Sequence, residues 1–154
     1  KEETMDKFET MVQTYEHKQN VSKFISFILH DLIIRSIYHD DSKLESPEVE
    51  IFTEYTPKLA NSTYGSDEYK QFLKEMKPAL DHHYANNSHH PEHYDNGIKD
   101  MDLVDLIEMI CDWKAATLRH NDGDIYKSIE LNQKRFGYSD ELKQIFKNTV
   151  DEYF

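Results

Sequence analysis

The sequence predicts an all-α protein that forms one helical bundle over residues 1–154. Only four glycines and four prolines occur in the chain. Apolar residues recur at spacings of three and four along almost the whole sequence, and this spacing places them on one face of a helix. The pattern favours helices and argues against a sheet. The length is that of one domain with a single core.

Two apolar stripes predict the N-terminal helices. The first stripe contains Met5, Phe8, Val12 and Tyr15. The second stripe follows Asn20, a residue type that caps helix N-termini, and predicts a helix from Val21 to about His39.

Caps and prolines set the boundaries of the next helices. In Ser46-Pro47-Glu48, a cap residue is followed by a proline in the first turn, which predicts a helix start. We expect Pro57 to end this short helix. Ser66 is expected to begin another helix, which Pro78 kinks. The Asn-rich, histidine-rich segment 82–97 comes next and is expected to be irregular or a single helical turn.

Three helices are predicted in the C-terminal part of the chain. The first begins at about Asp102, and its apolar side is expected to carry Leu103, Leu106, Ile107, Ile110 and Trp113. Residues 121–124 read as a turn. The next helix runs to about Phe136 and ends at Gly137, and Ser139 begins the last one.

The chain is strongly acidic, with 18 Lys and Arg against 30 Asp and Glu and a formal charge of −12. Such a surface repels phosphate backbones and anionic lipids, which argues against broad nucleic-acid or membrane binding. No apolar run has the length that a bilayer span needs. Cys111, the only cysteine, lies in an apolar run, so we expect a buried, reduced thiol and a cytoplasmic protein.

Histidines and carboxylates gather in two stretches. HDDSK places His39 and Asp40 at the end of an apolar helix, with Lys43 three residues later. HHYANNSHHPEHYDNG, residues 82–97, holds five of the nine histidines. Imidazoles and carboxylates are common metal ligands, so the two stretches together indicate a metal site. Taken alone, each is also explained by exposed polar residues at a helix end or in a turn.

A third group of acidic residues lies on the helix predicted from Asp102. Asp105, Glu108 and Asp112 are spaced three and four apart and share one face. This spacing is typical of a solvated face. Asp112 is the exception, because it directly precedes Trp113 in IEMICDW, where a fully exposed carboxylate is less expected. We therefore include Asp112 among the candidate ligands.

The order of these residues resembles the HD-domain superfamily of metal-dependent phosphohydrolases. HDDSK is similar to the HD-x-G/S-K signature of that superfamily. HHPEHYDNG is similar to the HHE-containing segment of its subfamily that cleaves cyclic dinucleotides, although the GYP part of that signature is absent. Over nearly its full length the chain resembles more closely a family of uncharacterised phage and bacterial proteins marked by HD-x-SK, HHPEH and EM-x-x-DW.

The resemblance implies a helical bundle that binds divalent metal, with two ions expected and Fe, Mn, Zn, Ni and Mg not distinguished. The implied ligands are His17, His39, Asp40, His83, His89, His90 and Asp112. In this set His17, in TYEHKQNV, takes the place of the early histidine of the superfamily. His82 is the alternative to His83.

The implied function is hydrolysis of a nucleotide or another small phosphate ester by a metal-bridged hydroxide, with Asp40 and Lys43 as catalytic residues. Two alternatives stay open. The same ligands suit di-iron oxygen chemistry, and an acidic chain of phage origin can also be a non-catalytic interaction or inhibitor protein. Members of the superfamily often associate as dimers, so a homodimer also stays open.

Overall fold

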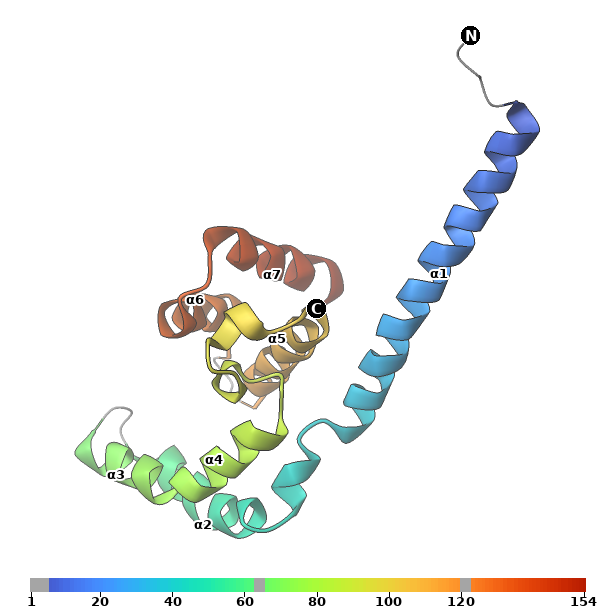
Figure 1. Ribbon diagram of the computed structural model, residues 1–154. Coiled ribbons are helices and arrows are strands. Elements are labelled where there is room, and N and C mark those ends of the chain that lie inside the picture. Colours follow the sequence, from blue (N-terminus) through green and yellow to red (C-terminus); the bar gives the residue numbers. More distant parts are fainter. Residues whose placement is uncertain (1–5, 63–65, 120–122) are drawn as a thin grey trace. The chain divides into compact units, whose positions relative to one another are not determined.

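All regular secondary structure that the computed structural model describes is helical, which confirms the all-α class (Figure 1). The described residues are 6–62, 66–119 and 123–154. The chain divides into two units, Lys1–Ile37 and Tyr38–Phe154. The single domain over 1–154 stays a prediction. Among the described residues, no helix is both long enough and apolar enough to cross a membrane.

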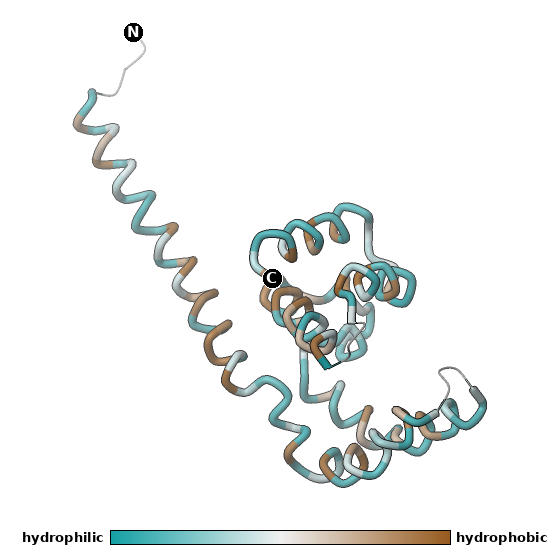
Figure 2. Tube along the Cα trace, turned by 180° about the vertical axis from the view of Figure 1, so that it is seen from behind, coloured by the Kyte–Doolittle hydropathy of each residue, from teal (hydrophilic) through white to brown (hydrophobic). Residues whose placement is uncertain are grey.

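Helix α1 (Lys7–Tyr38) accounts for nearly all that is described of the first unit. The predicted start after Asn20 is wrong, because the helix continues through this residue from Lys7 onwards. Neither glycine nor proline occurs between Lys7 and Tyr38, so nothing breaks the hydrogen-bond ladder. No residue of α1 is buried. Figure 2 shows that its apolar residues gather in the C-terminal half. Met5 lies outside the described residues.

The second unit begins with η1 (Asp41–Leu44), α2 (Glu48–Asn61), α3 (Asp67–Glu75) and α4 (Lys77–Asn86). Pro47, rather than Ser46, is the residue before α2. Pro57 lies inside α2 and does not end it, since a proline removes a single N–H from the ladder. Ser66 caps α3 as predicted, and its Oγ accepts from the Tyr69 N–H at 3.1 Å. At Pro78 the chain forms two helices, α3 and α4, instead of one kinked helix.

The core of the second unit is formed by α5 (Leu103–Thr117), α6 (Ile125–Phe136) and α7 (Asp140–Tyr153). Their starts follow the predicted caps: Asp102 forms a capping box with Asp105, and Ser139 Oγ accepts from the Leu142 N–H. Gly137 ends α6 with a φ of +67°, which a residue without Cβ adopts readily. The buried core contains Met109, Ile110, Trp113, Ile125, Ile129, Tyr138, Phe146 and Val150.

The inward face of α5 differs from the predicted one. Leu103 and Ile107 are 72% and 41% exposed, whereas Met109 is buried. Cys111 is exposed, so the expectation of a buried thiol is wrong. The core covers α5 on the side of Met109, and the histidine-rich segment covers it on the side of Asp105, whereas Cys111 lies on neither side. Residues 120–122, which include the first half of the predicted turn, lie outside the described residues.

Candidate metal centre

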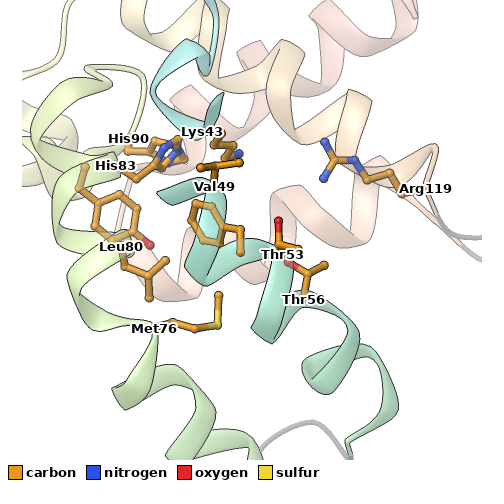
Figure 3. Close-up of a pocket in the computed structure, with 11 residues that line it drawn as sticks. Lys43, Val49, Thr53, Thr56, Met76, Leu80, His83, His90 and Arg119 are labelled. Atoms are coloured by element: carbon orange, nitrogen blue, oxygen red, sulfur yellow. The ribbon is translucent and has the colours of Figure 1, made fainter. Parts of the chain in front are cut away.

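Six of the seven predicted metal ligands meet within Tyr38–Phe154. His39 and Asp40 follow α1, His83 lies on α4, His89 and His90 lie in the segment after α4, and Asp112 lies on α5. His83 and His90, with Lys43, also line a cavity of about 540 Å³ (Figure 3). His17 lies on α1 in the unit Lys1–Ile37 and is exposed, and its role stays a prediction.

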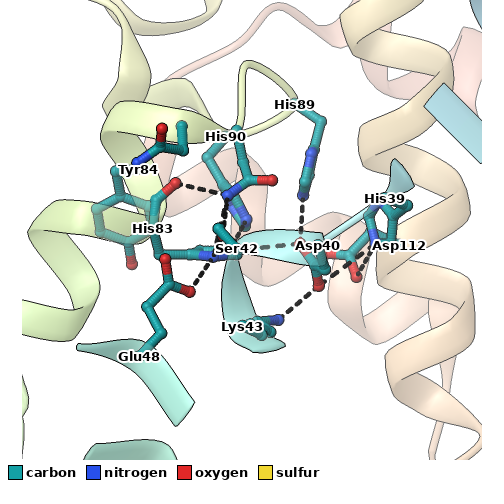
Figure 4. Close-up of polar contacts among 12 residues, drawn as sticks. His39, Asp40, Ser42, Lys43, Glu48, His83, Tyr84, His89, His90 and Asp112 are labelled. Atoms are coloured by element: carbon teal, nitrogen blue, oxygen red, sulfur yellow. Dashed lines mark hydrogen bonds and ion pairs between the residues drawn. The ribbon is translucent and has the colours of Figure 1, made fainter. Parts of the chain in front are cut away.

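The carboxylate of Asp40 lies between two sets of donor atoms (Figure 4). Its Oδ1 is 3.5 Å from the Nε2 atoms of His83 and His89, and His90 completes this first set. Its Oδ2 is 3.4 Å from His39 Nε2, which in turn is 3.5 Å from Asp112 Oδ1. One carboxylate can therefore contribute an oxygen to each of two neighbouring cation sites.

The backbone at Asp40 places this carboxylate. Asp40 has a φ of +60° and is the one non-glycine residue with positive φ in the described chain. Aspartate tolerates the left-handed region better than most residues, at a cost of about 1–2 kcal/mol. The turn ends α1 and begins η1, where Lys43 Nζ lies 2.5 Å from Asp40 Oδ2. Strain of this kind collects at functional sites.

Two buried atoms of the centre have no hydrogen-bond partner among the described residues: Asp40 Oδ1 and His89 Nε2. An unpaired buried polar atom costs about 1–3 kcal/mol. Their separation of 3.5 Å is too long for a good hydrogen bond. Ligand atoms about 2.1 Å from a tetrahedral ion lie about 3.4 Å apart, so the donors fit a bound cation. A mixed nitrogen and oxygen set suits Zn, Fe, Mn or Ni.

Protonation differs sharply within the cluster. Contacts to Asp112 and Glu108 raise the pKa of His39 to about 10. Burial, with His89 and His83 nearby, lowers the pKa of His90 to about 3. His90 therefore presents the neutral imidazole that a metal needs. The protonated His39 supplies positive charge where carboxylates converge, which is the role that a cation would take over.

The two aspartates stay ionised. Burial opposes the charge on Asp40, but Lys43, His39 and His83 outweigh it and lower the pKa of the carboxyl. Burial likewise opposes the charge on Asp112, and His39 and His89 outweigh it. Both groups therefore offer carboxylate oxygens at neutral pH.

Two glutamates that the sequence did not single out orient the histidines. Glu48, which is fully buried, accepts from His82 Nδ1 at 2.7 Å and from His83 Nδ1 at 2.9 Å. Glu108 lies 2.8 Å from His39 Nδ1 and 3.2 Å from His89 Nδ1. For His83 and His89 this geometry assigns the imidazole proton to Nδ1 and leaves Nε2 directed at Asp40. Carboxylate partners of this kind are usual behind metal-binding histidines.

Asp105 anchors the histidine-rich segment. It is 1% exposed and accepts from the Ser88 hydroxyl at 2.7 Å and from the Tyr94 hydroxyl at 2.6 Å. The expectation of a solvated face for Asp105 and Glu108 is therefore wrong, because the segment covers it. The shared spacing of these residues with Asp112 was the signal available in the sequence. Nothing in the spacing around Glu48 pointed to its role.

Comparison with curated proteins and with solved structures gives no match. A family model matches residues 6–152, a range that contains every residue of the centre. The chain therefore belongs to that family, DUF5662, a family of unknown function.

Proposed function

We propose that the protein is a metal-dependent phosphohydrolase of the HD-domain type that acts in the cytoplasm on a nucleotide or another small phosphate ester. The observation that carries the proposal is Asp40, whose two oxygens face two donor sets while its Oδ2 also pairs with Lys43. Bridging carboxylates and a nearby cation are the parts that phosphoryl transfer on two metals requires.

The residues of this chain have separate tasks in such a reaction. His83, His89, His90 and Asp40 would hold one ion, and His39, Asp40 and Asp112 the other. Divalent ions bound there would supply an activated water and positive charge for the phosphoryl group.

Lys43 stands at the border of the centre and the cavity, so its ammonium can hold a phosphoryl oxygen and offset the charge that develops on it. The cavity volume of about 540 Å³ suits a small molecule rather than a polymer. The net charge of −12 further disfavours long polyanions.

The first experiment measures metal content and phosphate release on protein purified without a histidine tag or chelator. Wild-type protein should bind about two ions and release phosphate from p-nitrophenyl phosphate with Mn²⁺ or Fe²⁺. Asp40→Ala should lose most of the metal and the activity. Asp41→Ala, the exposed neighbour, is the matched control and should lose neither.

The alternatives give different results in the same experiment. Bound iron that consumes oxygen and releases no phosphate would replace the proposal with di-iron chemistry. Absence of metal from the wild-type protein would replace it with a non-catalytic interaction protein. Equal metal content in Asp40→Ala and wild type would remove Asp40 from the centre.

A further inference from the structure

The cavity beside the metal centre has its own chemistry. Its apolar wall residues are Val49 and Phe52 of α2, Met76 between α3 and α4, and Leu80 of α4. At one end the cavity shares His83, His90 and Lys43 with the centre. A phosphate ester held at the centre would therefore place its leaving group against these walls.

Among the described residues, Phe52 is one of two aromatic residues that line the cavity, the other being Tyr84, whose ring lies 5.2 Å from that of His90. The Phe52 ring lies edge-on to the His83 imidazole, with centroids 6.2 Å apart and planes at 85°. It is thus held next to the centre, where the first atoms beyond the phosphate would lie. Aromatic and apolar walls favour planar, weakly hydrated groups over polyhydroxylated ones. Thr53 and Thr56 add hydroxyl groups that can pair with polar edges of such a ring.

The charge of the lining contrasts with that of the chain. None of the described residues that line this cavity is a carboxylate, although the sequence holds 30 Asp and Glu. Two permanent cations, Lys43 and Arg119, line it instead. In Figure 3, Arg119 lies on the opposite side of the cavity from His83 and His90. The cavity therefore has one positive charge at the metal centre, from Lys43, and a second on its opposite side, from Arg119.

We propose that this cavity binds the leaving group of the substrate, and that this group is a planar, largely apolar ring system with a second anionic group that pairs with Arg119. The inference rests on the proposed function, since it takes the scissile phosphate to lie at the metal centre. It assigns Phe52 and Arg119 as specificity-determining residues with no part in the chemical step.

The test compares three ligands on the metal-loaded protein. Adenosine 3′,5′-bisphosphate carries a ring and two anions, adenosine 5′-monophosphate has one anionic group fewer, and glycerol 3-phosphate has no ring. Calorimetric binding should be strongest for the first and weakest for the last. Arg119→Gln should weaken binding of the bisphosphate about tenfold, the usual scale of one charge-assisted contact, and leave the monophosphate nearly unchanged. Arg119→Lys should restore part of the loss.

Two further variants complete the test. Phe52→Leu should weaken both adenosine ligands and leave glycerol 3-phosphate unchanged. Lys99→Gln removes a charge from an exposed residue and is the control for net charge. Equal binding of the three ligands, or equal losses in Arg119→Gln and Lys99→Gln, would overturn the inference. Hydrolysis of p-nitrophenyl phosphate reports separately on the proposed function, because this small ester does not need Arg119.

Discussion

Glu48→Gln is expected to weaken metal binding, although Glu48 contributes no atom to the donor groups of the centre. The two carboxylate oxygens of Glu48 accept one N–H each, from His82 and His83. Glutamine has the same shape, but it offers one acceptor and one donor. The glutamine carbonyl can therefore accept from only one of the two imidazoles, and the other imidazole faces the glutamine NH₂ group, which cannot accept a hydrogen bond.

The hydrogen bonds around His83 indicate how much metal affinity the Glu48→Gln substitution would remove. The amide of Asn87 donates to Ser42 Oγ and to the His83 carbonyl, both at 2.8 Å. Glu48 Oε2, at 2.9 Å, is the nearest acceptor for the His83 Nδ1 proton, and Ser42 Oγ is farther away at 3.3 Å. If the glutamine amide donates to Nδ1, the proton moves to Nε2, the atom that faces Asp40. Loss of such a partner typically lowers metal affinity 10–100-fold, or about 1.4–2.8 kcal/mol.

The assay is a Co²⁺ titration of metal-stripped protein, followed by calorimetry and by the visible absorption of the bound ion. Glu54→Gln is the matched control, because Glu54 lies on the same helix, is exposed and pairs with Lys58 at 2.6 Å. The control should keep wild-type affinity. Wild-type Co²⁺ affinity in Glu48→Gln, with or without a lower melting temperature of the metal-free protein, would refute the orienting role.

Two other predictions concern Lys43 and the pH dependence of stability. Lys43→Ala should keep wild-type metal content and lower kcat/KM for p-nitrophenyl phosphate at least tenfold, whereas the exposed Lys99→Ala should not; unchanged kinetics would remove Lys43 from the reaction. Metal-free protein should be most stable near pH 6.5 in thermal melts. Above that pH, the stabilisation from His39, with its raised pKa, is lost toward about pH 10. Below pH 6.5, the unfolded chain takes up protons that the folded state denies to His83 and His90, so stability falls as the pH falls. A melting temperature that keeps rising above pH 6.5 would contradict the assignment for His39, and one that keeps rising as the pH falls below 6.5 would contradict the assignments for His83 and His90.

Local signals predicted four helix boundaries of the second unit. Ser66, Asp102, Gly137 and Ser139 each act through contacts within four residues, so the sequence contains nearly all that determines them. The failure at Asn20 has the same physical basis. An asparagine caps a helix only when the preceding chain leaves the helix, and residues 7–19 contain nothing that makes it leave.

The residues of the site were harder to predict from the sequence than the helices were. Histidines and the HD pair stand out because their side chains are natural ligands, and the resemblance to a known superfamily ordered them. Glu48 and Glu108 do not stand out, because a glutamate on a helix is usually solvated. Their roles arise only when α2 meets α4 and when the histidine-rich segment covers α5. Contacts between distant segments carry this information, and spacing along one helix does not.

The acidity of the chain and an anionic substrate are compatible only if positive charge is concentrated locally. Lys43 and Arg119 supply two charges in a cavity lining without carboxylates. At the centre, a dication that displaces the proton from His39 raises the local charge by one, and a second dication adds two more. Phosphate affinity should therefore depend on metal occupancy. By linkage, a bound phosphate ester must tighten metal binding by the same factor, so substrate and metal are expected to assemble the active centre together.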